Sequence, residues 1–129
     1  GELRAARGGV EGGADGEGGL VVGILDIGAE RPVPGYAHYS VSKAALAMLV
    51  RCIAVELAPG VRAVGVSPGQ VAWPEDYDEI KREAIRRRIP MRRVGTPEDV
   101  ARVVRFLARE GGYLNGTVVE VDGGLHARY

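Results

Sequence analysis

The sequence has 129 residues, enough for one small domain, and 46% of them are hydrophobic, as in ordinary soluble globular proteins. Its 17 basic and 17 acidic side chains cancel, so no net charge attracts a nucleic acid or an anionic membrane surface. A single cysteine, Cys52, excludes an internal disulfide, and no apolar run reaches the roughly 20 residues that a membrane-spanning helix needs. Because the N-terminus lacks a secretory pattern, we expect a cytoplasmic protein that binds neither nucleic acid nor membranes.

The first 19 residues are dominated by glycine, which occupies eight of these positions. These glycines neither follow a strand nor open a helix, so they do not match a phosphate-binding loop. Glycine loses more conformational entropy on ordering than any other residue. We therefore predict a flexible connector over residues 1–19 and a folded unit over residues 20–129.

Three segments have the pattern of buried parallel strands. Residues 20–25 form a continuous apolar run, which is typical of a strand covered on both faces. Similar strands are predicted over residues 61–66 and 117–121. Asp26 follows the first strand, at the edge where open α/β sheets bind their ligands.

A long helix is predicted from about residues 36–39 to Leu57, after a rigid turn at residues 31–35. Tyr39 and Lys43 stand four residues apart on it, so they share one face. An ammonium group close to a phenol lowers the pKa of the phenol, which suits proton transfer to a carbonyl or imine. Taken alone, the pair also fits a surface tyrosine beside a solvated lysine.

The segment after the second strand has aromatic and charged side chains. Trp73 and Tyr77 suit stacking on a flat ring, and they equally suit the edge of a core. A short helix follows, with Ile80, Ala84, Ile85 and Ile89 expected to face inward. Its arginines alternate with acids, which favours a solvated face over a nucleic-acid site. The run Thr96-Pro97-Glu98-Asp99 predicts the start of the last helix. No histidine has metal-ligand spacing, so we predict no metal site.

Four motifs occur in order along the chain. They are Gly35-Tyr36-Ala37-His38-Tyr39-Ser40-Val41-Ser42-Lys43, Ser67-Pro68-Gly69, Gly95-Thr96-Pro97-Glu98-Asp99 and Asn115-Gly116-Thr117-Val118-Val119-Glu120-Val121-Asp122-Gly123-Gly124. Together they resemble short-chain dehydrogenases/reductases over about residues 20–126. The resemblance implies an α/β fold. Because the family's chain is roughly twice as long, this chain would be the C-terminal half of a doubly wound Rossmann-type parallel sheet, with three parallel strands and helices.

The resemblance also implies roles for particular residues. It implies a reductase that uses NADPH, with NADH left open, and it makes Asp26, Tyr39 and Lys43 catalytic. Tyr39 would supply the proton, while Lys43 would lower the pKa of Tyr39 and hold the nicotinamide ribose. The implied cofactor-binding residues are Tyr39, Lys43, Pro68, Gly69 and Val71. Trp73 stands where the family usually has a threonine.

Asp26 replaces the serine that most members of the family have, and Glu30-Arg31-Pro32 follows it. This pattern is similar to pteridine and dihydromonapterin reductases. It implies reduction of a C=N or C=O bond in a pterin-like substrate contacted by Asp26, Trp73 and Tyr77. The implied partners are further copies of the chain, through the helix at residues 39–57, and a complementing N-terminal half.

Two alternatives stay open. The chain could be a short-chain dehydrogenase that acts on another carbonyl compound or alcohol. It could also be a non-catalytic truncated remnant or a self-associating assembly module, since half a doubly wound sheet leaves one strand edge unpaired.

Overall fold

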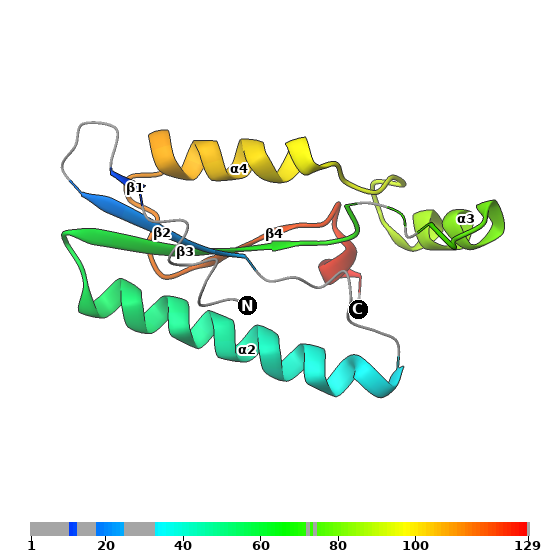
Figure 1. Cartoon of the computed structure of the whole chain (residues 1–129), viewed down its shortest axis with the longest axis horizontal. Helices are drawn as coiled ribbons and strands as arrows, with labels where there is room; N and C mark the ends of the chain where they lie inside the picture. Colours follow the sequence, from blue (N-terminus) through cyan, green and yellow to red (C-terminus); the bar gives the residue numbers. More distant parts are fainter. Residues whose placement is uncertain (1–10, 13–17, 25–32, 72, 74, 129) are drawn as a thin grey trace.

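The structure is a computed structural model that describes residues 11–12, 18–24, 33–71, 73 and 75–128, with the side chains of 11–12, 33–40 and 42 left undescribed. The elements in chain order are β1 (Glu11–Gly12), β2 (Gly19–Ile24), α2 (Val33–Glu56), β3 (Val61–Pro68), α3 (Glu79–Arg88), α4 (Pro97–Arg109), β4 (Val118–Val121) and the 3-10 helix η1 (Leu125–Ala127). In Figure 1, α4 covers one face of the sheet and α2 covers the other, which gives three layers.

The strands form one sheet in the order β1-β2-β3-β4. β2 runs parallel to β3, in register from Gly19 opposite Val61 to Ile24 opposite Val66. β3 runs parallel to β4, and Ser67 stands opposite Glu120. The prediction of three parallel strands with helices is therefore confirmed.

β1 is an addition to the predicted sheet. Its two residues pair antiparallel with Gly19 and Leu20 at the start of β2. Residues 1–10 and 13–17, the rest of the predicted connector, lie outside the described residues, so flexibility there stays a prediction.

The face of the sheet under α4 is a closed apolar core. Leu20, Val22, Val64, Val66 and Leu107 are buried there and pack together. These strand residues alternate along the chain, because successive strand side chains point to opposite faces. Val119 and Val121 of β4 join this core. We call it the α4 face.

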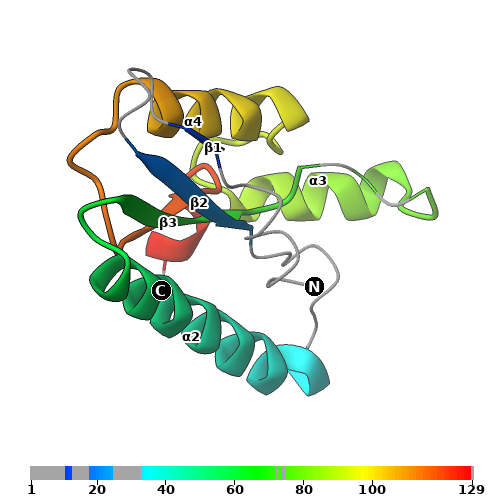
Figure 2. The same ribbon diagram turned by 60° about the vertical axis from the view of Figure 1, so that its left-hand side comes forward.

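The opposite face, which we call the α2 face, has smaller side chains. Val21 and Ala63 pack there against Leu46, Val50 and Ala54 of α2. A methyl group added at Gly65 would lie 3.0 Å from a methyl of Val118 and 3.5 Å from one of Val50, so the helix packs close to the strands. Figure 2 shows α2 crossing this face along its length.

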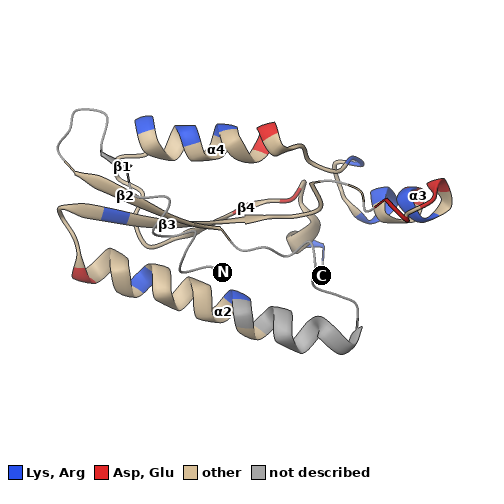
Figure 3. Cartoon of the chain, in the orientation of Figure 1, with Lys and Arg blue, Asp and Glu red and all other residues tan. Residues whose placement is uncertain are grey.

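α2 begins at Val33, earlier than predicted, so Pro34 and Gly35 belong to its first turn rather than to a separate turn. Proline is favoured in a first turn, where its missing N–H costs no intrahelical bond. Away from the sheet the helix exposes Val41, Met48 and Val55 at 68%, 54% and 79%. Figure 3 shows few charges along the described part of α2, whereas α3 is covered with them. The helix therefore presents an apolar outer face.

α3 projects from the end of the molecule instead of packing on the sheet, as Figures 1 and 2 show. The expectation that Ile80 and Ala84 face inward is wrong, because Ile80 is 83% exposed and Ala84 is also exposed. Ile85 is half-buried, and Ile89, just past the helix, is buried as expected. The apolar residues of α3 do recur at helical spacing, but among the described residues no element lies opposite the first turns of this helix.

Two polar side chains fix the connection between α4 and β4. Arg62, at the start of β3, donates to the carbonyl oxygens of Leu107, Gly111 and Leu114 at 2.8, 2.7 and 3.1 Å. Asn115 accepts from the amide of Ala63 at 2.8 Å and donates to the carbonyl of α2's Ala54 at 3.1 Å. These bonds satisfy helix-end carbonyls and hold β4 beside β3.

Among the described residues, none of the helices combines the length and apolarity that a bilayer crossing requires.

Candidate functional site

The candidate site lies where β3 and β4 end, on the α2 face. Lys43 of α2 reaches this edge, and its Nζ lies 2.6 Å from Oε2 of Glu120 in β4. The two side chains are 30% and 19% exposed, so the ion pair is partly withdrawn from water. Such a pair is held more firmly than an ordinary surface salt bridge, because water screens it less.

Strand alternation shows which groups share this edge. Val119 and Val121 belong to the α4 face, so Glu120 between them points to the α2 face. Ser67 follows Ala63 and Gly65 on β3 at intervals of two, and it is the register partner of Glu120. The α2 face therefore changes from apolar along most of its length to polar at its C-terminal edge.

Ser67 is fully buried, and its Oγ has no hydrogen-bond partner among the described residues. Most buried polar side-chain atoms in proteins do have a partner. An unpartnered hydroxyl beside an ion pair marks this edge as one built for polar contacts.

Of the three predicted catalytic residues, Lys43 is the one whose side chain is described. Tyr39 lies four residues before it in the same continuous helix, but its side chain lies outside the described residues. Asp26, two positions after β2, also lies outside them. Convergence of the three groups on one cleft therefore stays a prediction.

The turn after β3 positions the predicted cofactor-binding backbone. Pro68 ends the strand, and the amide of Gly69 donates to the carbonyl of Val121 at 3.0 Å. A Cβ at Gly69 would lie 2.6 Å from the Cβ of Asp122, closer than real contacts allow. Glycine is therefore required here so that the β3 turn can pack against the end of β4.

The described residues fit the nicotinamide end of a dinucleotide. The backbone N–H and C=O of Val71 make no hydrogen bond to another backbone group among the described residues, and a carboxamide offers one acceptor and one donor to match them. The ammonium of Lys43 is a hydrogen-bond donor at this edge, and ribose hydroxyl groups are acceptors for such a group.

Asp122 organises the turn that follows β4. Its carboxylate accepts from the amides of Gly124 and His126 at 3.0 and 2.9 Å, and it lies 3.0 Å from Nδ1 of His126. Burial alone would raise the pKa of Asp122, but the hydrogen bonds from His126 and Gly124 outweigh it and leave the pKa lowered. Gly123 and Gly124 have φ of 65° and 94°, in the left-handed region that glycine favours. The turn thus holds the end of β4 in place.

Glu120, Asp122 and His126 each offer a ligand atom within 4.8 Å of the others. However, Glu120 is paired with Lys43, and Asp122 accepts from the turn. These contacts account for the cluster without an ion, and the predicted lack of a metal stays a prediction.

A pocket of about 370 Å³ opens next to this turn, between it and the segment that leads into α4. Its charged lining residues are Arg93, Asp99, Glu120, Asp122 and His126. Arg93 lies 2.9 Å from Asp99. The Arg93 guanidinium, together with the amide of Thr96, lowers the pKa of Asp99 to about 2. Glu120 is thus shared between the pocket and the Lys43 edge.

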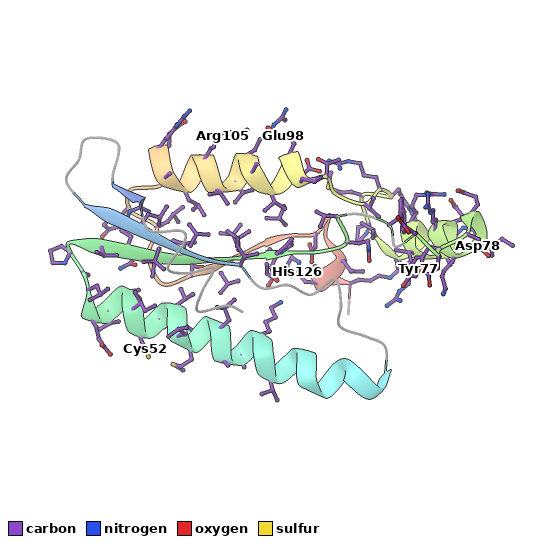
Figure 4. The ribbon with its side chains drawn as sticks, viewed as in Figure 1. Cys52, Tyr77, Asp78, Glu98, Arg105 and His126 are labelled. Carbon is purple, nitrogen blue, oxygen red and sulfur yellow. The ribbon has the colours of Figure 1, made fainter. Side chains whose placement is uncertain are left out.

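The predicted substrate residues Trp73 and Tyr77 lie with α3. Arg82 and Arg86 stand over the Trp73 ring at 5.4 and 5.7 Å, and Lys81 stands over the Tyr77 ring at 4.5 Å. Figure 4 shows Tyr77 beside the projecting helix and His126 at the edge of the sheet. Each ring already has a cation on it, and a role in binding substrate stays a prediction.

Sequence reasoning missed two residues of this edge, Ser67 as a polar group and Glu120 as the partner of Lys43. One signal could have found Glu120, since it is the single charge in the strand Val118–Val121 and has valine on both sides. No local pattern predicts that Lys43 is its partner, because the two residues lie far apart in sequence.

Comparison with known proteins identifies the relatives of this chain. The family model described as Enoyl-(Acyl carrier protein) reductase matches residues 6–126. Dehydrogenase/reductase SDR family member 4 of Homo sapiens is 38% identical over 120 residues, which are 86% of this chain and 42% of the relative.

Two other relatives carry more specific names. Pteridine reductase 1 of Leishmania tarentolae is 38% identical over 107 residues, which are 81% of this chain and 37% of the relative. 3beta-hydroxysteroid dehydrogenase 1 of Eggerthella lenta is 35% identical over 113 residues, which are 83% of this chain and 43% of the relative.

The chain thus spans less than half the length of these curated relatives. The family model covers nearly all of the chain, and the parallel strands, the Tyr39 to Lys43 helix and the glycine turn after β3 agree with it. The chain belongs to the short-chain dehydrogenase/reductase family.

Proposed function

We propose that this chain supplies the catalytic half of an NADPH-dependent short-chain reductase of the pteridine reductase type. The reaction is reduction of a C=N or C=O bond in a pterin-like substrate. The observation that carries the proposal is the place of Lys43, which lies at the C-terminal edge of the parallel strands, on the helix that also contains Tyr39. Open α/β sheets bind their ligands at this edge.

Each residue has a definite task in this reaction. The nicotinamide, when bound, supplies hydride to the substrate carbon. Tyr39 gives a proton to the neighbouring nitrogen or oxygen, and Lys43 stabilises the phenolate that is left. Lys43 also donates to ribose hydroxyls, while the backbone at Pro68, Gly69 and Val71 holds the carboxamide.

The pterin preference is supported by the chemistry of Asp26. An ionised carboxylate only accepts hydrogen bonds, so it suits the N–H groups of a pterin ring better than a bare carbonyl oxygen. Trp73 and Tyr77 would stack on the flat ring. One relative, from Leishmania tarentolae, is named a pteridine reductase.

A second candidate function is oxidation or reduction of another alcohol or carbonyl compound. Relatives of similar identity have other names, among them a 3beta-hydroxysteroid dehydrogenase and an SDR family member. NADH in place of NADPH belongs to this alternative as well, since the described residues contain no group assigned to the 2′-phosphate. A cytoplasmic location also stays a prediction.

Two features of the structure support the proposed partners. The exposed apolar side chains of α2, including Val41, Met48 and Val55, would be covered in a homo-oligomer built through residues 39–57. Among the described residues, β2 pairs beyond Leu20 on one side only. That edge would accept a strand from a complementing N-terminal half.

The reaction is tested by the rate at which the protein oxidises NADPH with a dihydropterin or with a simple ketone. Tyr39→Phe and Lys43→Met should abolish turnover of both substrates, because each removes a group needed for proton transfer. Arg109→Met, which removes an exposed charge at the end of α4, is the matched control and should keep full activity.

The substrate class is tested by Asp26→Ser in the same assay. Turnover of the dihydropterin should fall more than turnover of the ketone. Equal losses would remove the pterin argument, and NADPH oxidation with neither substrate in the unchanged protein would refute the proposed reaction.

Binding separates an enzyme from the non-catalytic alternatives. The emission of NADPH should change when the protein is added. An unchanged emission at high protein concentration would favour a truncated remnant or a self-associating assembly module.

A further inference from the structure

Glu120 occupies a position where a strand normally has an apolar side chain. It lies in β4 between Val119 and Val121, on the α2 face that carries Val21, Ala63 and other apolar groups along most of its length. A carboxylate there is 19% exposed and loses much of its hydration. Such a charge is costly unless it is paired, and a hydrophobic residue would pack the position more favourably.

We propose that Glu120 is a positioning residue that holds the ammonium group of Lys43 at the cofactor edge of the sheet. The proposal rests on the reductase function proposed above. Nζ of Lys43 and Oε2 of Glu120 lie 2.6 Å apart, which is a charge-assisted hydrogen bond. Lysine has a long, flexible side chain, and a short contact to a fixed carboxylate restricts the positions of its ammonium group.

The anchor is itself held rigidly. Glu120 stands in the β3–β4 ladder opposite Ser67, and the next turn is fixed by the Asp122 carboxylate. A functional group held by a strand is placed more accurately than one held by a loop. Because Glu120 is fixed by the sheet, its contact restricts the motion of the flexible Lys43 side chain.

Ser67 provides an independent observation at the same place. Its hydroxyl is fully buried, lacks a partner among the described residues and leaves the same face as Glu120. A position chosen only for packing would be filled by alanine, as Ala63 is on the same strand. The polar edge thus extends beyond the ion pair.

The same contact has an opposite interpretation that experiment can separate. If Glu120 competed with the ribose for Lys43, the pair would inhibit cofactor binding and its removal would strengthen binding. If Glu120 positions Lys43, its removal weakens binding. Positioning and competition thus predict changes of opposite sign in cofactor affinity when Glu120 is removed.

The first test examines Lys43 without a cofactor. Lys43 and Lys81 are the lysines of the sequence, so side-chain amine NMR of the isotope-labelled protein reads one against the other. Glu120→Gln should shift the Lys43 resonance and leave Lys81 in place, and Glu120→Asp should return Lys43 towards its original position. Glu110→Gln, which removes an exposed carboxylate beyond α4, should move neither. A Lys43 resonance unaffected by Glu120→Gln would overturn the proposal.

The second test uses steady-state kinetics of the active protein. Glu120→Gln should raise the KM for NADPH about tenfold, as expected for loss of a charge-assisted bond that orders Lys43. It should lower kcat on the order of tenfold or more, since misplacing a catalytic group by 1 Å is that costly. The KM for the second substrate should stay unchanged, and Glu120→Asp should recover part of both losses.

Three outcomes of this second test count against the proposal. Tighter NADPH binding by Glu120→Gln would establish competition instead of positioning. Unchanged kinetics, or losses that follow thermal stability and are not recovered in Glu120→Asp, would leave Glu120 a structural residue. If the unchanged protein oxidises no substrate, the proposed function fails, and the NMR result then decides the placement of Lys43 by itself.

Discussion

The two faces of the sheet are built for different purposes. The α4 face is apolar over most of its length, with Leu20, Val64 and Leu107 almost fully buried. Its one polar group described above is Arg62, which bonds to carbonyls at the end of α4. The α2 face is apolar where Val50 and Ala54 cross it and becomes polar at the end of the strands. Because side chains alternate, β3 supplies both faces. It contributes Val66 to the α4 face and Ser67, whose hydroxyl has no partner among the described residues, to the α2 face. The α4 face therefore serves mainly stability, while the polar end of the α2 face is available for chemistry. Substitutions on the two faces should have different consequences.

Leu107→Ala should have the largest effect on stability. Leu107 is fully buried in the middle of the α4 face, and removing its branched side chain leaves a cavity. Such a change lowers the free energy of unfolding by about 2–5 kcal/mol, measured by denaturant unfolding. Ile80→Ala on the exposed side of α3 is the control, with a change of about 0.5 kcal/mol or less. A similar small change for Leu107→Ala would contradict the assignment of this face as the main core.

Thr96→Ala should have an intermediate effect, because it removes the cap of α4. The amide of Asp99 donates to the Thr96 hydroxyl at 3.2 Å, and the amide of Thr96 donates to the Asp99 carboxylate at 2.8 Å. Loss of such a cap costs about 1 kcal/mol, read from the same unfolding curves. Thr117→Ala, at an exposed position outside any helix, is the matched substitution and should change stability less. Equal effects at the two threonines would argue against the cap.

Acid should weaken the same helix start. The pKa of Asp99 is lowered to about 2 by the Arg93 guanidinium and the Thr96 amide. A carboxyl group with a lowered pKa stabilises the fold above its unfolded pKa, and the contribution disappears as pH falls towards the folded value. Between about pH 4 and pH 2, the unfolding midpoint should therefore fall more in the unchanged protein than in Asp99→Asn. Parallel pH curves would show that Asp99 does not titrate in this way.

Ser67→Ala should have the smallest effect on stability, since the hydroxyl has no hydrogen-bond partner among the described residues. The free energy of unfolding should change by about 0.5 kcal/mol or less, or rise slightly. The mirror substitution Ala63→Ser places a hydroxyl in the apolar part of the same face and should cost about 1–3 kcal/mol. If the two substitutions were equally harmful, the α2 face would not be divided into apolar and polar parts.

Local sequence patterns predicted the features that depend on residues close together in the sequence. The continuous apolar runs indicated parallel strands because such strands are buried on both faces, and β2, β3 and β4 are parallel. The run from Thr96 to Asp99 indicated a helix start because its side chains bond to their own backbone, and both of those bonds are present. Lys43 lies at the C-terminal edge of the sheet, and its predicted convergence with Asp26 and Tyr39 stays a prediction.

The features that were missed depend on distant parts of the chain. Helical spacing in α3 shows that an apolar stripe exists, but it cannot show whether another element covers it, and Ile80 is 83% exposed. Position 69 requires glycine because Asp122 packs against it, and Lys43 pairs with Glu120 of β4. In both cases the two residues lie far apart in the sequence. The roles of Asp26 and Tyr39 still depend on the resemblance, because their side chains lie outside the described residues.

The central claim is that the nicotinamide end of the cofactor binds beside Lys43. Titration of the isotope-labelled protein with NADPH, followed at the two lysine amines, tests it most directly. The account predicts a saturable shift of Lys43 that exceeds any shift of Lys81 on α3. Binding of NADPH that left Lys43 unmoved, or that moved Lys81 alone, would contradict it.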